Sequence, residues 1–149
     1  MVLKEQTNKL MDKQIIRQLL ADGKSSISEK IWIKSLKLFY KSFTKNHIKT
    51  ITRAVINTTP LIKVKQLKQK RKRLQLKEFP YIVNKKNWIP SALKLLLNKT
   101  KKEKEIKMYQ KLVNELVNVA KKSGGSITKR KSLYEYAFLK KKYFFYRWF

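Results

Sequence analysis

Apolar residues recur at helical spacing over most of the chain, with one interruption near the middle. The first amphipathic stripe consists of Leu10, Ile15, Ile16, Leu19 and Leu20. Asp22-Gly23 follows it, and glycine readily adopts the left-handed conformation that closes a helix. A capping box at Ser26–Glu29 predicts the start of a second helix. A third helix, capped by Asn46, should end before Pro60, because the residue before a proline avoids the helical region.

The second predicted helix separates apolar and basic positions onto two faces. Its apolar seam comprises Ile31, Trp32, Leu36, Phe39 and Phe43. Its lysine face comprises Lys30, Lys34, Lys37 and Lys41. A helix of this kind is expected to bury the apolar seam in a bundle and to leave the lysines on the outside.

The period of the pattern changes after Pro60. Ile62–Lys65 and Leu74–Lys77 alternate apolar and polar residues, which is typical of half-exposed strands. The basic run 68–73 lies between them. We therefore predict a two-stranded β-ribbon over about residues 61–83, with the basic run at its tip.

Helical spacing returns after a polar turn at 84–87. Apolar residues from Ile89 to Leu97 predict a fourth helix, in which Pro90 is tolerable only within the first turn. Residues 99–104 are interpreted as a charged linker. The chain as a whole is predicted to be mainly α: a bundle of about six helices in a single domain over residues 1–149, with a projecting β-ribbon between the third and fourth helices.

The strongest predicted helix covers Tyr109–Ala120. Lys111 and Glu115 are four positions apart and are expected to pair on its outer side. The glycine-containing segment 123–126 ends this helix, and a last helix is predicted from about Ser132.

Basic residues greatly outnumber acidic ones. The chain has 38 Lys and Arg against 9 Asp and Glu, a formal net charge of +29. Fifteen basic residues and no acidic one lie from Lys30 to Lys77. Most of this charge has no partner within the chain, and a bound polyanion would relieve the resulting self-repulsion. Nucleic acid is the expected partner, because each neutralised phosphate also releases counterions.

Two segments have more than one interpretation. The basic run 68–73 is either a solvated loop or an arm that contacts RNA, and the flanking strands favour the arm. Aromatic rings from Tyr143 to Phe149 follow Lys140–Lys142. These rings either anchor a helix end in the core or stack on bases while the lysines bind phosphates.

The sequence contains no recognisable active site. Cysteine is absent, which excludes disulfides, thiolate metal ligands and cysteine nucleophiles. No glycine-rich phosphate loop occurs, and His47 is interpreted as a polar residue at the start of a helix. No enzymatic activity, metal or cofactor is therefore predicted. A membrane span is not expected either, since no apolar run approaches the ~20 residues that a span requires.

Amino-acid usage indicates an AT-rich gene. Lys outnumbers Arg 32 to 6, although Arg is usually the better phosphate ligand. Met1–Leu10 has no apolar core and resembles no targeting segment. An organelle-encoded protein of the mitochondrial matrix fits both observations, and a plastid or the cytoplasm of an AT-rich bacterium is the alternative.

Several short motifs occur in a fixed order along nearly the whole chain. They are Leu19–Ser26, then Pro60, Val64 and Lys65 of the ribbon, Lys85-Lys86, Leu112–Leu116, the loop residues Gly124, Lys129 and Arg130, and Tyr146–Trp148. Over about residues 8–148 they together resemble the family of small-subunit ribosomal protein seven. The chain departs from that family at Lys70–Arg73, where the family has a glycine-containing turn, and at Lys131-Ser132, where it has an acidic pair.

The resemblance implies a helical bundle with a projecting β-ribbon and a structural role in the small ribosomal subunit. It further implies binding to the 3′ major domain of small-subunit rRNA, nucleation of head assembly, and other proteins of the head as partners. A position near the exit-site tRNA and the mRNA path is also expected. The predicted RNA contacts are Lys9, Lys24, Lys30, Lys34, Lys37, Lys63, Lys65, Lys68, Lys70, Arg71, Lys72, Arg73, Lys85, Lys86, Lys129, Arg130, Lys140, Lys141, Arg147 and Trp148.

Composition alone also permits an organellar DNA-binding or nucleoid-packaging protein. A DNA reader is expected to have a helix-turn-helix, or Arg and Asn placed for base edges. A nuclease would need clustered carboxylates for a metal ion. The sequence has neither pattern, so the ribosomal interpretation is favoured.

Overall fold

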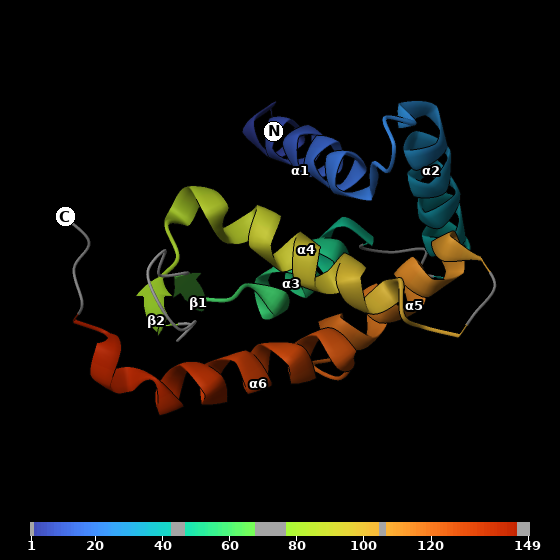
Figure 1. The fold of residues 1–149 in the computed structure, drawn as a ribbon. Helices are drawn as coiled ribbons and strands as arrows, with labels where there is room; N and C mark the ends of the chain where they lie inside the picture. Colours follow the sequence, from blue (N-terminus) through green and yellow to red (C-terminus); the bar gives the residue numbers. More distant parts are fainter. Residues whose placement is uncertain (1, 43–46, 68–76, 105–106, 146–149) are drawn as a thin grey trace.

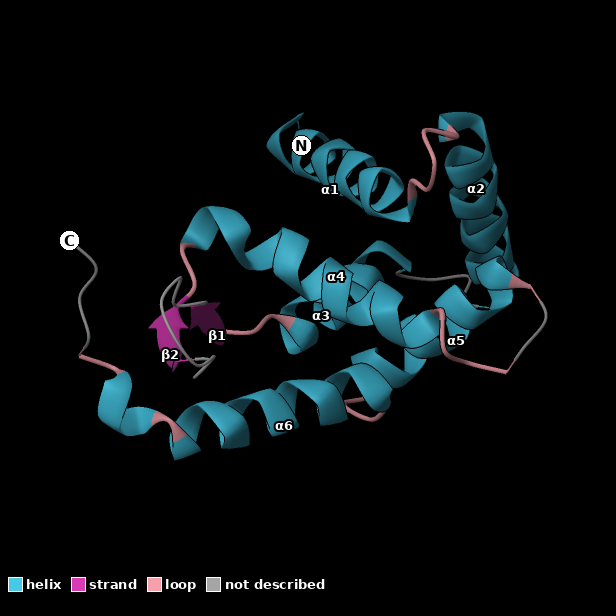
Figure 2. Cartoon of the chain, viewed as in Figure 1, coloured by secondary structure: helices cyan, strands magenta, loops and turns pink. Residues whose placement is uncertain are grey.

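The computed structural model describes residues 2–42, 47–67, 77–104 and 107–145, with the side chains of 2–10, 67 and 77 outside that description. Within these ranges it contains six α-helices and one two-stranded antiparallel ribbon (Figures 1 and 2). The elements are α1 (Val2–Leu19), α2 (Ser25–Ser42), α3 (His47–Thr58), β1 (Ile62–Leu67), β2 (Lys77–Ile82), η1 (Lys85–Asn87), α4 (Trp88–Thr100), α5 (Met108–Ala120), α6 (Gly125–Leu139) and η2 (Lys141–Tyr143). The predicted fold class is confirmed.

All six helices contribute to one apolar core. In Figure 1, α1 and α2 lie above α3, α4 and α5, and α6 runs along the lower edge toward the ribbon. Leu112, Leu116 and Val119 on α5 recur at helical spacing and are almost completely buried. Phe39 of α2 and Leu96 of α4 belong to the same buried cluster. The amphipathic stripe that predicted the strongest helix therefore forms the centre of the bundle.

Helix α2 begins at Ser25, after a left-handed turn in which Asp22 has φ 52° and Gly23 has φ 73°. The turn at Asp22-Gly23 is confirmed. The predicted capping box is wrong, because Ser26 lies inside the first turn of the helix. Ser28 is buried instead, and its Oγ donates to the Ser25 carbonyl at 2.7 Å. The predicted cap of the third helix, Asn46, lies outside the described residues.

The ribbon pairs Ile62 with Ile82 and Val64 with Pro80. Within the described residues the second strand includes Lys77 of the predicted Leu74–Lys77 and continues to Ile82, and residues 74–76 lie outside the description. Strand β2 continues through Pro80, within the predicted ribbon range of about 61–83. A strand of a two-stranded ribbon always has a free edge, and proline is tolerated there because its missing N–H is not needed.

The boundaries of the last helices differ from the prediction. Helix α4 extends to Thr100, so part of the predicted charged linker is helical. Helix α6 begins at Gly125, seven positions before the predicted Ser132. Glu115 is not on an outer face but 1% exposed. Its Oε1 accepts hydrogen bonds from Ser126 N at 2.8 Å and Ser126 Oγ at 2.6 Å. A carboxylate from α5 thus satisfies the free amide end of α6, where negative charge is favourable.

Candidate nucleic-acid interface

The lysine row of α2 lies on the face opposite to its buried residues. The buried positions are Ser28, Trp32, Ser35 and Phe39, and the exposed lysines are Lys30, Lys34, Lys37 and Lys41. Each lysine is two residues beyond a buried position, which is a rotation of about 200° around the helix axis. Packing of the apolar face on α1 and α5 therefore fixes the direction of the lysine row.

Other predicted contacts lie in short connecting segments. Lys24 is exposed in the turn before α2, and Lys85 and Lys86 are exposed in η1. The η1 segment is held at its end by the Trp88 indole, whose Nε1 donates to the Val83 carbonyl at 2.9 Å. Lys9 lies on α1, and its side chain is outside the described residues. These lysines are presented on backbone that adjoins packed helices.

Only the base of the basic ribbon is within the described residues. Lys63 is half-buried, and its Nζ donates to Ser91 Oγ of α4 at 2.6 Å. Burial lowers the pKa of Lys63, and the positive charge of Lys94 lowers it further. Lys65 is exposed. The predicted contacts at the tip, Lys68 and Lys70–Arg73, lie outside the described residues.

A polar joint connects β2 to the far end of α6. Glu78 accepts hydrogen bonds from the Tyr136 hydroxyl and from Gln66 Nε2, the latter at 2.8 Å. Lys140 Nζ lies 3.5 Å from the same carboxylate. The Tyr136 hydrogen bond is the main cause that lowers the pKa of Glu78, followed by that of Gln66. Nearby, the Leu61 amide donates to the Tyr134 hydroxyl at 2.9 Å. The direction of the ribbon is thus coupled to α6.

Lys129 and Arg130 lie on α6, not in a loop as the sequence interpretation had them. Lys129 is exposed. The Arg130 guanidinium donates to the Asn57 carbonyl in the last turn of α3 and lies 5.9 Å from the centroid of the Tyr134 ring. A basic group at the C-terminus of a helix is favourable. Arg130 therefore has a structural contact within the fold, and its contact with RNA stays a prediction.

The aromatic residues near the C-terminus are partly packed and partly exposed, and their stacking on bases stays a prediction. Tyr143 packs edge-on against the buried Phe79 ring, with centroids 5.6 Å apart, which anchors η2 to the ribbon. Phe138 and Phe145 are 67% and 87% exposed, and Lys141 Nζ lies 4.7 Å from the Phe138 centroid. Exposed rings beside lysines remain available for stacking. The predicted contacts Arg147 and Trp148 lie outside the described residues.

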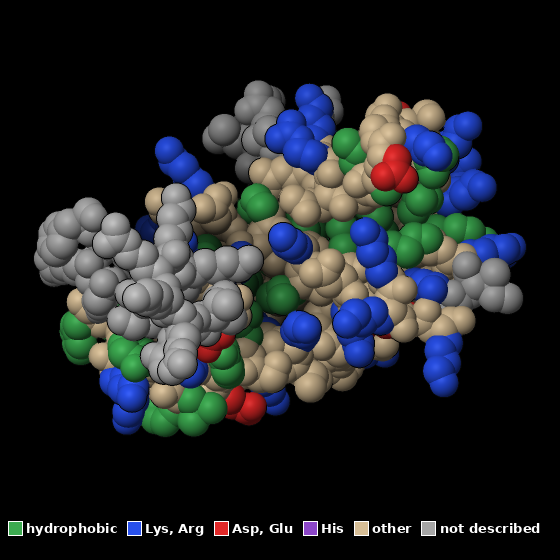
Figure 3. All heavy atoms as spheres, viewed as in Figure 1, with side chains coloured by type: hydrophobic (Ala, Val, Ile, Leu, Met, Phe, Trp, Pro, Cys, Tyr) green, Lys and Arg blue, Asp and Glu red, His purple; other side chains and the backbone are tan. Residues whose placement is uncertain are grey.

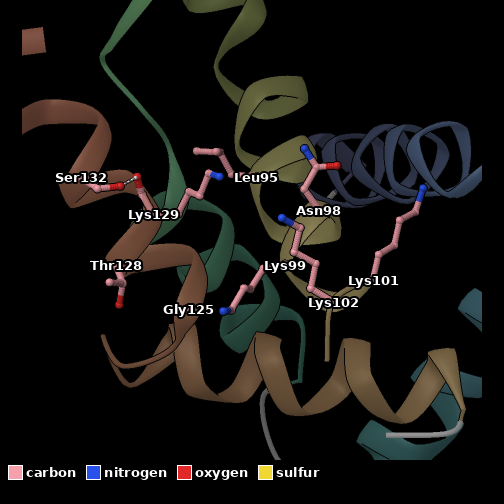
Figure 4. Close-up of a pocket in the computed structure, with 9 residues that line it drawn as sticks. All are labelled: Leu95, Asn98, Lys99, Lys101, Lys102, Gly125, Thr128, Lys129 and Ser132. Atoms are coloured by element: carbon pink, nitrogen blue, oxygen red, sulfur yellow. Dashed lines mark hydrogen bonds between the residues drawn. The ribbon is translucent and has the colours of Figure 1, made fainter. Parts of the chain in front are cut away.

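Sequence reasoning missed a group of lysines between α4 and α6. Lys99, Lys101 and Lys102 were interpreted as part of a linker, but they line a hollow together with Lys129 of α6 (Figure 4). Continuing the helical period of α4 beyond Leu97 would have placed these side chains on the helix surface. Their proximity to α6 comes from tertiary packing and has no signal in the sequence.

The described residues do not suggest a catalytic centre. Among them, no three His, Cys, Asp or Glu side chains lie close enough together to hold a metal ion. His47 begins α3, as predicted, with its ring 4.1 Å from that of Tyr40. None of the helices in the described ranges has the length and apolarity needed to cross a membrane.

The charge distribution suits a large anionic surface better than a single small ligand. Figure 3 shows Lys and Arg side chains spread over the viewed face, above α2 and across the middle of the molecule, with few carboxylates among them. The chain has only 9 acidic residues for its 38 Lys and Arg, and two of them, Glu78 and Glu115, accept hydrogen bonds from Tyr136 and Ser126. Carboxylates of the chain can therefore neutralise only a minority of the lysines, and an external polyanion can neutralise the others.

Comparisons with known proteins agree on one family. A family model described as "Ribosomal protein S7p/S5e" matches residues 2–141. Small ribosomal subunit protein uS7m of Reclinomonas americana is 30% identical over 135 residues, which are 91% of this chain and 83% of that protein. Protein uS7c of Euglena longa is 29% identical over 126 residues, 85% and 70% of the two chains. Protein uS7 of Dictyoglomus thermophilum is 26% identical over 141 residues, 95% and 88% of the two chains.

Proposed function

The chain belongs to the ribosomal protein S7p/S5e family, and from this premise we propose that it binds the 3′ major domain of small-subunit rRNA through its lysine-bearing faces. It is a protein of the small ribosomal subunit with a structural role, and its family is not one of enzymes. Ribosomal RNA and neighbouring ribosomal proteins are accordingly its partners.

The observation that carries the proposal is the two-faced helix α2. Its buried face holds the helix rigidly in the bundle, while Lys30, Lys34 and Lys37 are exposed on the other side. Lysines on a rigid helix can bind phosphates at fixed spacing, which positions the protein on folded RNA without reading bases. Other exposed lysines, which we propose as separate contacts, are Lys65 at the base of the ribbon, Lys85 and Lys86 of η1, and Lys129 of α6. The basic run 68–73 is proposed as a further contact.

We infer the wider role from the same family. Binding to the 3′ major domain would nucleate assembly of the head of the small subunit, near the exit-site tRNA and the mRNA path. Two of the relatives are mitochondrial and plastid proteins. Together with the excess of Lys over Arg, 32 to 6, this supports an organellar ribosome, and we propose the mitochondrial matrix.

The test compares two variants with the same loss of charge. The first replaces the lysines of the α2 face: Lys30→Gln, Lys34→Gln and Lys37→Gln. The control replaces exposed lysines outside the predicted contacts: Lys13→Gln, Lys121→Gln and Lys131→Gln. Affinity for an rRNA fragment of the 3′ major domain is measured from low to moderate salt. The α2 variant should flatten the plot of log affinity against log salt by about 2, and the control should not. Both should melt at the wild-type temperature.

Two outcomes would count against the proposal. An equal flattening in both variants would mean that binding reflects total charge and not the α2 face. Duplex DNA of the same length that competes as well as the rRNA fragment would favour the DNA-packaging alternative, because a protein built for A-form RNA should discriminate between them by shape.

A further inference from the structure

A basic hollow lies between the end of α4 and the start of α6. It has a volume of about 560 Å³ and is lined by Leu95, Asn98, Lys99, Lys101, Lys102, Gly125, Thr128, Lys129 and Ser132. Figure 4 shows lysines reaching into this space from both sides, Lys99 from α4 and Lys129 from α6. Four of the nine lining residues are lysines, and no carboxylate is among them.

The position of Lys99 places a positive charge beside the start of α6. A Cβ atom at Gly125 would lie 1.9 Å from Lys99 Cε and 2.8 Å from Lys99 Nζ. The ammonium group therefore lies directly against the first residue of α6, where the helix dipole is also positive. A larger residue at 125 would have to displace the end of the Lys99 side chain. The like charges of these lysines repel one another. An anion bound in the hollow would be attracted to each of them, which would offset their mutual repulsion.

The lining indicates which anion the hollow would bind. No aromatic ring lines it, and Leu95 is the only aliphatic side chain longer than a methyl group there. A free nucleotide needs a surface on which its base can stack, and the hollow has none. Asn98, Thr128 and Ser132 supply amide and hydroxyl groups, which suit phosphate oxygens and ribose hydroxyls.

We propose that this hollow, defined by Lys99, Lys101, Lys102 and Lys129, clamps the sugar-phosphate backbone of RNA independently of base sequence. The proposal rests on the proposed rRNA-binding function and adds to it a second site, away from the α2 lysine face. The hollow positions the RNA and does not read it, because phosphate contacts carry no sequence information directly.

Helix α6 provides its own control for the test. Lys131 is exposed and two residues beyond Lys129, a rotation of about 200° that places it on the other side of the helix. The hollow variant is Lys102→Gln with Lys129→Gln, and the control is Lys121→Gln with Lys131→Gln. Both remove two charges from exposed positions. The hollow variant should flatten the salt dependence of rRNA-fragment binding by about 1.5, and by the same amount for an unrelated folded RNA. The control should leave it unchanged.

A third variant, Gly125→Ala, tests geometry without changing charge. The new methyl group displaces the Lys99 side chain, and the backbone at Gly125 has no positive φ that alanine would resist. Affinity for both RNAs should fall severalfold while the melting temperature does not fall. Unchanged RNA affinity in this variant would contradict the role of Lys99.

The outcomes separate the two proposals. If wild-type protein does not bind the rRNA fragment, the proposed function fails. If it binds but the hollow and control variants lose affinity equally, only the hollow proposal fails. A loss confined to the rRNA fragment would contradict a sequence-independent clamp. A last outcome is that inorganic tripolyphosphate shifts the Gly125 amide NMR signal while the hollow variant binds RNA with wild-type affinity. The hollow would then bind small anions, and the RNA proposal would be wrong.

Discussion

Replacement of Glu115 by Ala should destabilise the fold far more than the sequence suggests. Glu115 is 1% exposed, and both of its hydrogen bonds go to Ser126, at 2.8 and 2.6 Å. A hydrogen bond to a charged group contributes about 1.5–3 kcal/mol. The variant loses two such bonds and leaves buried donors of Ser126 unsatisfied, but it also removes the desolvation cost of a buried carboxylate. We expect a net loss of about 3 kcal/mol in the free energy of unfolding.

Thermal and urea unfolding of the purified protein would measure this loss. For a chain of this size, about 3 kcal/mol corresponds to a fall in Tm of roughly 6–12 °C. The matched control is Lys111→Ala, which removes the other member of the predicted surface pair. Lys111 Nζ instead donates to the Glu103 carbonyl at 2.6 Å. A double-mutant cycle with Ser126→Ala should give a coupling energy of at least about 1 kcal/mol between the two residues.

The opposing interpretation makes a different numerical prediction. If Glu115 and Lys111 formed only an exposed pair four positions apart, each replacement would cost about 0.3–0.5 kcal/mol. A Glu115→Ala variant that loses less than about 1 kcal/mol, or no more than Lys111→Ala, would refute the assignment of Glu115 as the cap of α6.

Two further predictions concern pKa values. Burial raises the pKa of Asp12 above its ordinary value of 3.8, while Trp32 and His47 oppose the shift. The folded state therefore loses stability as pH rises through the folded pKa of Asp12. Asp12→Asn should melt at or above the wild-type temperature at pH 7, because it removes the buried charge. Thermal melts should show this advantage disappearing below about pH 4. A less stable variant at pH 7 would mean that the interactions of the carboxylate outweigh its burial. In Tyr136→Phe, the depressed pKa of Glu78 should rise toward its ordinary value, as followed by carboxyl NMR, because the main hydrogen bond that lowers it is lost. A Glu78 titration identical to that of the wild type would show that the hydroxyl does not bond to the carboxylate.

The sequence predicted those parts of the fold that depend on local periodicity. The stripe of α5, the helix break at Pro60 and the position of Pro90 in the first turn of α4 are all consequences of spacing within one element. Spacing also predicted which side of α2 carries lysines, because the buried and basic positions are offset by two residues. Amphipathic patterns report which face is buried, and the structure agrees with them where the pattern is regular.

The errors arose where a partner element decides the outcome. Glu115 was expected on the outer side because it is charged, yet it lies three positions after Leu112 and four before Val119, on the buried side of α5, where Ser126 of α6 hydrogen-bonds to it. Helix α5 ends at Ala120, and Gly124, with φ 110°, is the residue directly before α6, so the glycine pair that was predicted to end one helix stands at the start of the next. The hollow was missed for a similar reason: Lys99 and Lys129 are brought together by the packing of α4 on α6.

Two glutamates hold α6 in the orientation that the proposed RNA surface requires. Glu115 of α5 satisfies its first turn, and Glu78 of β2 binds Tyr136 near its end. Replacing Glu115 by Ala makes the protein more positive by one charge, so electrostatics alone would strengthen RNA binding. If α6 must instead be held in place to present Lys129 to the hollow, the same replacement should weaken RNA binding at temperatures where the variant is still folded. The sign of that change distinguishes binding that depends on net charge alone from binding that depends on the positions of particular lysines. Tighter binding by the folded Glu115→Ala variant would favour dependence on net charge, whereas weaker binding would mean that the few carboxylates of this basic protein orient its lysines.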